Sequence, residues 1–422
     1  MEELYKREDD LTVKRISLVS VVLLIVMTMS VVGFTAEPIK FGAVNPLGDI
    51  TGFQTTRAME LAIKEINEAG GLLGRPVELI VVDDEMRPEI GAAAIDRLAT
   101  VDHVDFFVGG MGSGVHLAQV PTLKKYEKIT VWMGGASHQI ELAVGPDADW
   151  YFHLHPWDYQ QGASYGQGWT DIAQAHPEIS ASRIFLAHEE GAFGTDSYKA
   201  YVTLAEAAAE GEGPYGQILN EFAGASFTSA LLGGGDYRAM LRQAMTYDPD
   251  LFIWAGYDAD AVPMVAQVME LGFEPPLYVG APPGWPADFG KNPLSNGVIL
   301  YGMWAPALKE VSPVSEHFWN EYIKMHGHEP ATYFAPLGYT NIMFIAEAIK
   351  AAGTLEKDAL IEAMRTIEYE SPIGAVLKIA PSNIISNQGF TSQKILQYIN
   401  GEQHVIWPFD YATSEIKYPF GR

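Results

Sequence analysis

Residues 105–138 read DFFVGGMGSGVHLAQVPTLKKYEKITVWMGGASH, and this stretch decides the fold class. Its pattern predicts a strand over 105–109, a glycine-rich turn, a helix, a second strand over 129–133 and a second turn of small residues. Strands joined through a helix run parallel, so both turns should lie at the carboxyl edge of one sheet. Ligands of open α/β sheets bind in a crevice at this edge.

The first turn consists almost entirely of residues without a bulky side chain. Gly109, Gly110, Gly112 and Gly114 allow backbone N–H groups to approach a ligand closely. Ser113 adds a hydroxyl at the start of the following helix. The turn is therefore suited to an anionic or polar group, although a single serine in such a turn is more often a helix cap.

The second turn has the same character. Gly134, Gly135 and Ala136 clear space beside Ser137 and His138, which offer a hydroxyl and an imidazole. Ser137 could also act only as a helix cap. Two matching turns in one βαβ unit favour a binding pocket over two unrelated caps.

Length and composition bound the class of protein. A chain of 422 residues, 48% hydrophobic and 11% aromatic, is too long for one ordinary core and predicts two domains. The formal net charge of −26 argues against nucleic acid and anionic lipid as partners, because both would be repelled. The absence of cysteine excludes disulfides, thiolate metal sites, cysteine nucleophiles and a lipid anchor on an N-terminal cysteine.

Residues 1–36 have the pattern of a secretory signal peptide. Two basic residues precede an uncharged run over 16–35, which ends at Ala36 before a polar residue. Cleavage could follow Ala36 or Gly33, and the apolar run is also long enough to span a bilayer if it is not removed. We expect cleavage and export.

Strands and helices alternate along most of the chain, which predicts parallel sheets. The first series should form one lobe, with strands at 39–44, 76–83, 105–109 and 129–133. The aromatic segment 150–157 is expected to cross to a second lobe. The second series should form another parallel sheet, with strands at 183–187, 216–221, 251–255 and 277–280.

We therefore predict an α/β fold of two doubly wound parallel-sheet lobes. Helices over 317–325, 336–352 and 357–366 should complete the first lobe, after which the chain crosses back. The expected division assigns residues 37–155 and 301–370 to the first lobe. It assigns residues 156–300 and 371–422 to the second lobe and the C-terminal tail.

Motifs of catalysis and nucleotide binding are absent from the sequence. The chain contains no HExxH, GxSxG or GxxxxGK[ST]. Gly110, Gly112 and Gly114 only approximate a dinucleotide-binding pattern, because the third glycine comes one residue early. An enzyme is therefore not expected.

Two histidine pairs and one acidic cluster are candidates for metal binding. His153 and His155 lack a clear third ligand, so a place at a hinge or on the surface is expected. The same holds for His326 and His328. The run 83–85 (DDE) at a strand end is expected to form a solvated turn that caps a helix. We expect no metal and no cofactor.

Five segments, in this order, resemble the substrate-binding proteins of branched-chain amino acid ABC transporters. They are IKFGAV (39–44), EINEAGGLLGRPVELIVVDDE (65–85), FFVGGMGSG (106–114), GGASH (134–138) and LGYTNIMFIAEAIKAAG (337–353). The resemblance extends from about residue 39 to the C-terminus, and these relatives are type I periplasmic binding proteins. It implies two lobes joined by three hinge crossings, with a small ligand trapped between them. It also implies a monomeric periplasmic carrier that hands its ligand to an ABC permease and has no catalytic activity.

The resemblance also implies how a carboxylate is held. In relatives that bind amino acids, backbone N–H groups and a hydroxyl from each first-lobe turn hold the ligand carboxylate. The matching residues are Ser113 and Ser137, with Met111, Gly112 and Ala136 beside them.

Second-lobe turns supply aromatic residues in these relatives. Phe193 in EEGAFG and Tyr257 in the next turn match those positions. Many relatives also carry a glutamate that pairs the ligand's ammonium, but Pro282 stands where that carboxylate is expected. A buried unpaired ammonium is costly, so either Asp258 replaces the glutamate or the ligand has no amine.

An aromatic or aliphatic carboxylate is therefore a credible ligand, and amino acids remain open. The full set of candidate ligand-binding residues is Met111, Gly112, Ser113, Ala136, Ser137, His138, Phe193, Tyr257, Asp258, Trp285 and Phe334. A ligand sensor of the same fold that signals to a membrane receptor or regulator is the main alternative function. A hydrolase that uses Ser113 or Ser137 with His138 is disfavoured, because no orienting acid is evident.

Overall fold

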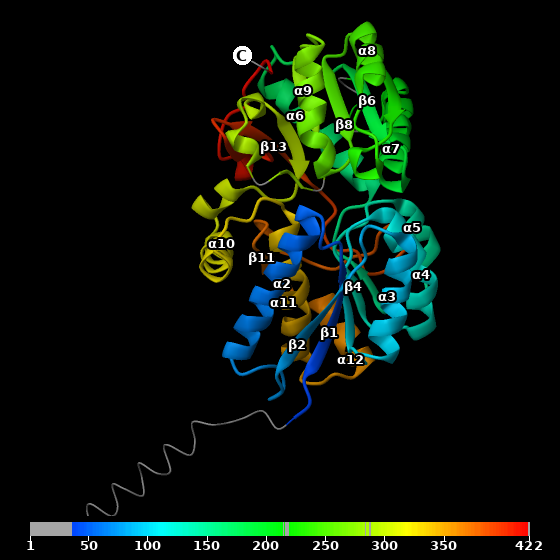
Figure 1. Cartoon of the computed structure of the whole chain (residues 1–422), viewed down its shortest axis with the longest axis vertical. Coiled ribbons are helices and arrows are strands. Elements are labelled where there is room, and N and C mark those ends of the chain that lie inside the picture. The colour runs from blue at the N-terminus through cyan, green and yellow to red at the C-terminus, as the bar shows by residue number, and fades with distance from the viewer. Residues whose placement is uncertain (1–35, 214, 216–218, 283, 287, 421–422) are drawn as a thin grey trace, which may run out of the picture.

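The computed structural model describes residues 36–213, 215, 219–282, 284–286 and 288–420. They form two α/β lobes arranged along the long axis of the molecule (Figure 1). The expected signal peptide lies, except for Ala36, outside the described residues. Of the helices in the described part of the chain, none combines the length and the apolar character that crossing a membrane requires.

The first lobe surrounds a parallel sheet with the order β2-β1-β3-β4-β5. Phe41 lies opposite Phe106 of the neighbouring strand and packs under α2 and α11, whereas Phe107 packs on the other face with α3 and α4. The strands are β1 (Ile39–Asn45), β2 (Val77–Asp83), β3 (Phe106–Gly109), β4 (Thr130–Trp132) and β5 (Tyr151–His153). The helices are α2 (Ile50–Glu68), α3 (Pro88–Thr100), α4 (Ser113–Tyr126), α5 (His138–Val144), α10 (Pro313–His326), α11 (Phe334–Ala352) and α12 (Lys357–Thr366).

The second lobe contains a larger sheet with the order β14-β13-β10-β9-β8-β6-β7. Its strands pair in parallel except β13 and β14, which are antiparallel. The strands are β6 (Arg183–Glu189), β7 (Glu221–Phe227), β8 (Leu251–Ala255), β9 (Leu277–Gly280), β10 (Ile299–Gly302), β13 (Lys394–Ile399) and β14 (Glu402–Trp407). The main helices are α6 (Asp158–Ala175), α7 (Ala192–Ala209), α8 (Arg238–Tyr247) and α9 (Asp258–Glu270). The predicted α/β class is confirmed.

Two expected elements differ in the structure. The segment 150–157 does more than cross between lobes, because its residues Tyr151–His153 pair with β4 as an edge strand of the first sheet. Its aromatic side chains fill the first-lobe core. The strand expected at 216–221 is instead β7 (Glu221–Phe227), and residues 216–218 lie outside the described part of the chain. β7 is an edge strand of mostly small, partly exposed residues, so its apolar pattern is weak.

The lobe boundaries also differ from those expected. β10 remains paired with β13 as far as Gly302, so this part of the second lobe ends two residues after the expected position. Residues 371–388 stay with the first lobe, where Asn387 Nδ2 donates to the carbonyls of Asp149 (2.7 Å) and Tyr151 (3.2 Å). The last crossing therefore occupies residues 389–393. A short apolar strand pattern indicates burial but does not identify the sheet that the strand joins.

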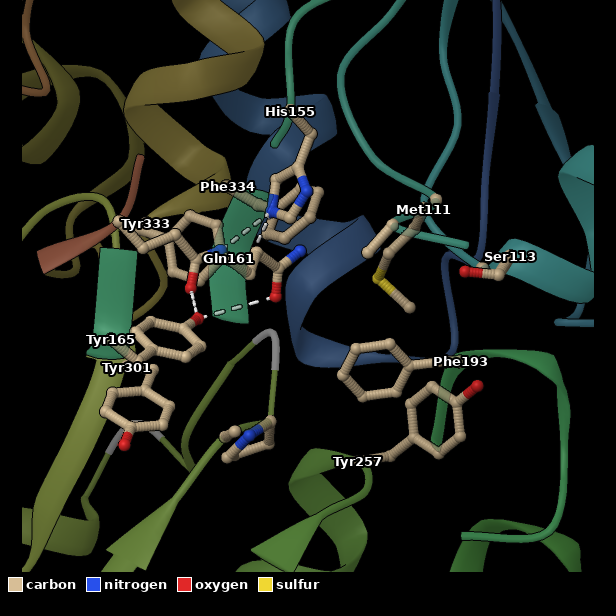
Figure 2. Close-up of a pocket in the computed structure, with 16 residues that line it drawn as sticks. Met111, Ser113, His155, Gln161, Tyr165, Phe193, Tyr257, Tyr301, Tyr333 and Phe334 are labelled. Carbon is tan, nitrogen blue, oxygen red and sulfur yellow. Dashed lines mark hydrogen bonds between the residues drawn. The ribbon is translucent and has the colours of Figure 1, made fainter. Parts of the chain in front are cut away.

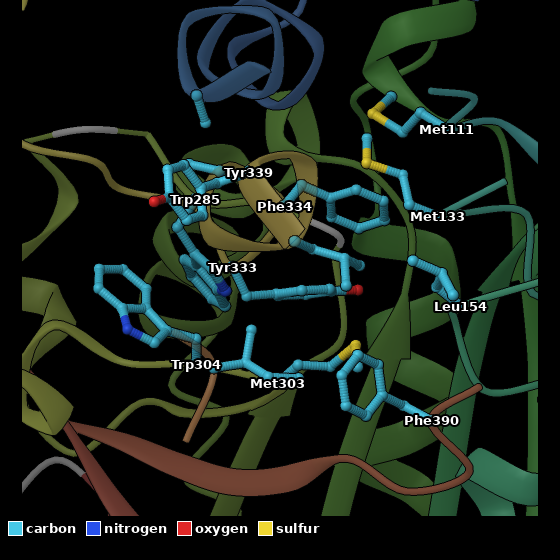
Figure 3. Packing of buried hydrophobic residues seen from close by; sticks show 14 of the residues in the cluster. Met111, Met133, Leu154, Trp285, Met303, Trp304, Tyr333, Phe334, Tyr339 and Phe390 are labelled. Atoms are coloured by element: carbon cyan, nitrogen blue, oxygen red, sulfur yellow. The ribbon is translucent and has the colours of Figure 1, made fainter. Parts of the chain in front are cut away.

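Three crossings connect the lobes, as the resemblance implied. Leu154, Met303 and Phe390, one from each crossing, belong to one buried cluster with Tyr333 and Phe334 (Figure 3). The three crossings are thus part of the buried core.

The acidic run at the end of β2 forms a turn in which Glu85 is exposed, as expected, but the run does not cap α3 and Asp84 is not solvated. Asp83 Oδ1 accepts hydrogen bonds from the N–H groups of Leu47 (3.0 Å) and Glu85 (2.9 Å). Asp84 is completely buried, and this burial raises its pKa to about 6. Arg87, not an acidic residue, occupies the N-cap of α3.

Candidate functional site

A cavity lies between the lobes, beside the two first-lobe turns (Figure 2). The space that no protein atom fills is about 440 Å³, including the part open to solvent. Side chains from both lobes contribute to its wall, so its free space depends on how closely the lobes approach each other. Its lining residues are Met111, Gly112, Ser113, Gly135, Ala136, His155, Gln161, Tyr165, Phe193, Tyr257, Ala281, Pro282, Tyr301, Tyr333, Phe334 and Gln393.

The glycines of the two turns close the turns around a buried side chain. A Cβ added at Gly110 would lie 2.6 Å from His116 Nε2, and one added at Gly135 would lie 2.1 Å from His116 Nδ1. Both glycines have φ of +79°, a conformation that disfavours other residues. A Cβ at Gly134 would lie 2.6 Å from the carbonyl oxygen of Gly110. Close packing of turn on turn therefore requires these glycines, independently of any ligand.

A single asparagine holds the strands that lead into these turns. Asn341 of α11 is fully buried. Its Oδ1 accepts from the N–H of Gly109 at 3.0 Å, and its Nδ2 donates to the carbonyl of Val131 at 2.9 Å. α11 thereby fixes the position of β3 relative to β4, and with it the distance between the two turns.

The two serines of the turns have different surroundings. Ser113 lies at the start of α4, lines the cavity and accepts the N–H of Ser137 at 3.3 Å. Ser137 caps α5, accepts the N–H of Gln139 at 3.2 Å and donates its hydroxyl to Asp196 of the second lobe. Ser137 is absent from the cavity lining among the described residues. The structure therefore offers a ligand the hydroxyl of Ser113 and not that of Ser137.

Second-lobe turns place two aromatic rings over the cavity. The centroids of Phe193 and Tyr257 are 6.0 Å apart, and both face Met111 of the first lobe (Figure 2). The turn before Phe193 is held by Glu189, whose carboxylate accepts the N–H groups of Gly191 and Gly194.

The backbone of Tyr257 is held in a similar way. Its N–H donates to Asp260 at 2.9 Å. Buried carboxylates under Phe193 and Tyr257 thus fix both turns, while only the aromatic rings reach the cavity.

A hydrogen-bonded polar group, which the sequence did not reveal, closes the far end. His155 Nε2 lies 3.0 Å from the hydroxyl of Tyr333 and 3.2 Å from Gln393 Nε2. Tyr165 donates to Gln393 and lies 3.4 Å from Gln161 Oε1. Burial lowers the pKa of His155 to about 3, so this group is uncharged at neutral pH.

The tyrosine at this end belongs to a stacked pair. The ring centroids of Tyr165 and Tyr301 are 3.5 Å apart, and the Tyr301 hydroxyl accepts from Trp169 Nε1 at 2.7 Å. A second, mainly apolar cavity, about 330 Å³ when its part open to solvent is included, shares Gln161, Tyr165, Phe193, Ala281 and Tyr301 with the first. The stacked tyrosine pair therefore lines both cavities.

The structure brings seven of the candidate residues to the cavity. They are Met111, Gly112, Ser113, Ala136, Phe193, Tyr257 and Phe334. Pro282 also lines the cavity, at the position where relatives were expected to carry a glutamate.

Four candidates lie elsewhere, Ser137 among them. Trp285 packs inside the second lobe against Trp254, Phe289 and Tyr398. Trp285 was a candidate for the cleft because it is a large aromatic residue, but its ring is part of the second-lobe core.

His138 and Asp258 lie at contacts between lobes. His138 Nδ1 is 2.8 Å from Asp158 Oδ2. The carboxyl of Asp258 interacts with Asp49 of the first lobe, and burial followed by this contact raises the pKa of Asp258. A carboxyl held in this way is a poor partner for a ligand ammonium.

The family model for periplasmic binding proteins matches residues 38–393. The chain belongs to this family. The resemblance to the branched-chain amino acid branch is confirmed, since a Leu/Ile/Val-binding protein homolog of Brucella abortus is 22% identical over 401 residues, covering 90% of this chain and 94% of the relative.

Solved structures show the same fold. A leucine-binding protein from Thermotoga maritima has a TM-score of 0.71 at 19% identity, covering 87% of this chain and 97% of that protein. A solute-binding protein of an ABC transporter from Rhodopseudomonas palustris, in complex with 3,4-dihydroxybenzoic acid, has a TM-score of 0.69 at 20% identity, covering 87% and 95%. This periplasmic binding protein is thus a solute-binding protein of the ABC transporter type.

Proposed function

We propose that this protein captures a small carboxylic acid that has no amine and carries it to an ABC importer. One observation supports the proposal above all: none of the cavity-lining residues among those described is Asp, Glu, Lys or Arg, although the lining comes from both lobes. An amino acid would bury an ammonium without a counter-charge in this cavity, which is costly.

A single carboxylate has a suitable place at the first-lobe end. The Ser113 hydroxyl remains able to donate, because in the described part of the chain its oxygen accepts from Ser137 N–H and its proton has no acceptor. Ser113 begins α4, and Gly112 at the N-cap makes no side-chain cap. The positive end of the helix dipole and this hydroxyl together favour an anion.

The body of the ligand would meet aromatic and polar walls. Phe193, Tyr257 and Phe334 offer ring faces, and the group around His155 and Gln393 offers uncharged hydrogen-bonding atoms at the far end. An aromatic acid, with or without a polar substituent, fits this distribution. The dihydroxybenzoic acid complex of the Rhodopseudomonas palustris protein is consistent with such a ligand class.

Matched ligand pairs test the proposal by titration calorimetry. Leucine is compared with 4-methylpentanoate, phenylalanine with 3-phenylpropanoate, and benzoate with benzamide. We expect each amine-free acid to bind about tenfold or more tightly than its amino acid or amide counterpart. Tighter binding of leucine or phenylalanine than of their amine-free analogues would contradict it.

A serine substitution tests the carboxylate end. Ser113→Ala should weaken the best acid about tenfold. Ser180→Ala, at an exposed serine of the second lobe, is the matched control and should leave affinity unchanged.

The remaining roles follow from the same proposal. The protein would be exported with removal of a signal peptide within residues 1–36, act as a periplasmic monomer without catalysis, and release its ligand to a membrane permease. Mass spectrometry of the mature N-terminus tests the first step. An N-terminus that retains the apolar run would instead support the anchored sensor alternative.

A further inference from the structure

A carboxylate of the protein itself bonds to one of the two serine turns. The hydroxyl of Ser137, in the turn after β4, donates to Asp196 Oδ2 of α7. The two residues belong to different lobes and are 1% and 3% exposed. According to the family resemblance, the hydroxyl of Ser137 should donate to the carboxylate of a ligand. In the structure it donates to the carboxylate of Asp196 instead.

This hydrogen bond uses the only hydroxyl proton that Ser137 has. A serine hydroxyl has one proton, which goes to Asp196, while its oxygen also accepts from Gln139 N–H. The backbone N–H of Ser137 donates to Ser113 Oγ. A ligand carboxylate can gain the hydroxyl of Ser137 only by displacing Asp196.

The charge of Asp196 is partly balanced on its outer side. Lys199 Nζ lies 3.1 Å from Asp196 Oδ1, and this lysine side chain is 60% exposed. One ring nitrogen of His138 and one carboxylate oxygen each from Asp158 and Asp196 lie within 4.8 Å of one another. Asp158 thus brings a second carboxylate near this end of the cleft, with His138 as its partner at 2.8 Å.

We propose that Asp196 determines which anions the cleft accepts, by competing with a ligand carboxylate for the hydroxyl of Ser137. This inference rests on the proposed capture of a carboxylic acid. One carboxylate can bind at Ser113, but a second anionic group near Ser137 would face the carboxylate of Asp196 at short range. The ligand class is thereby narrowed to monocarboxylates, with dicarboxylates and phosphate esters excluded.

Removal of the internal carboxylate tests this competition. Calorimetry compares benzoate, benzamide and phthalate on the wild type and Asp196→Ala. On the wild type we expect phthalate to bind more weakly than benzoate. On the variant we expect benzoate to bind about tenfold more tightly and phthalate to gain by a larger factor, while benzamide affinity changes less than about threefold. An equal gain for the two acids would contradict the selection against dicarboxylates. Asp248→Ala removes the same charge from an exposed side chain of the second lobe and should change none of the three.

Two double variants identify the mechanism. Adding Ser137→Ala to Asp196→Ala should abolish the gain for benzoate, because the released hydroxyl is then missing. Adding Lys199→Ala should preserve it. The competition model would be wrong if the gain in benzoate affinity persisted after Ser137→Ala was added or disappeared after Lys199→Ala was added. It would also be wrong if Asp248→Ala alone produced the same gain.

Asp196→Asn provides a second test if the alanine variant unfolds. Its amide oxygen can still accept from Ser137 without the negative charge, so a smaller gain for benzoate is expected, and no gain would overturn the inference. The proposed function fails separately: a wild type that binds none of the acids contradicts acid capture. Acid binding that is unchanged by Asp196→Ala and Asp196→Asn contradicts only the role of Asp196.

Discussion

His138 Nδ1 lies 2.8 Å from Asp158 Oδ2, and these residues belong to different lobes. Asp158 also accepts the backbone N–H of His138 at 3.1 Å. The contact joins the start of α5 to the start of α6, directly beside the first crossing. It couples the arrangement of the lobes to the protonation of one histidine.

The first prediction is a pH dependence of stability. The hydrogen bond to Asp158 raises the pKa of His138 above its usual value, so the contact is fully stabilising below the unfolded pKa of about 6.5. The stabilisation is lost as the pH rises through the higher folded pKa. We expect the wild type to exceed His138→Gln in thermal unfolding midpoint at about pH 5.5, with the difference shrinking towards about pH 8.5.

The control for this prediction is His176→Gln, at a histidine 3.7 Å from Glu178 in the second lobe. It should show no comparable trend. A difference between the wild type and His138→Gln that is equal at both ends of the pH range would contradict the role of the His138 contact.

The second prediction concerns the contact between Gly284 and α2. A Cβ added at Gly284 would lie 2.3 Å from Thr51 Oγ1 across the two lobes. Gly284→Ala should therefore hold the lobes apart and weaken the best-binding acid about tenfold, with little effect on thermal unfolding. Gly48→Ala, in the loop before the same helix, has open space around its Cβ and should bind normally. Normal binding by both variants would argue against a closure contact here.

The third prediction concerns a buried hydroxyl. Tyr301→Phe removes the hydroxyl that accepts from the fully buried Trp169 Nε1 and should lower the free energy of unfolding by about 1–3 kcal/mol. Tyr151→Phe is the matched control, because the buried hydroxyl of Tyr151 has no partner among the described residues and its removal should cost little. Urea unfolding of both variants measures the difference. Equal losses would show that the hydrogen bond from Trp169 to Tyr301 contributes nothing beyond the removal of a buried hydroxyl.

The fourth prediction concerns a lysine at the hinge. Lys394 Nζ donates to the carbonyls of Met303 (2.9 Å) and Ile373 (3.1 Å), and burial lowers its pKa to about 8. Between this pKa and the usual value near 10.5, the unfolded chain binds the extra proton. The stability of the wild type relative to Lys394→Met should therefore rise between about pH 7 and pH 10, by up to about 3 kcal/mol.

Denaturant unfolding across this pH range measures the effect. Lys378→Met is the control, because this lysine is 60% exposed and lies 2.7 Å from Glu368. Its difference from the wild type in free energy of unfolding should not change over this pH range. A falling difference for Lys394→Met would be inconsistent with a buried ammonium at the hinge.

The sequence by itself determined the α/β class, the two lobes with mainly parallel sheets and the position of the first-lobe turns. This was possible because strand–helix alternation and glycine-rich turns are local patterns, and parallel pairing forces consecutive turns to one edge. The family resemblance added Phe193 and Tyr257, which the structure places at the cavity. Their roles in binding remain proposals.

Only the tertiary structure decided which side chains meet. His155 and Gln393 are 238 residues apart in the sequence, and their contact depends on how two crossings pack together. Trp285 points into a core and Ser137 bonds to Asp196 for the same reason. A local pattern reports that a residue is buried, but its partners are set by the arrangement of elements that are distant in the chain.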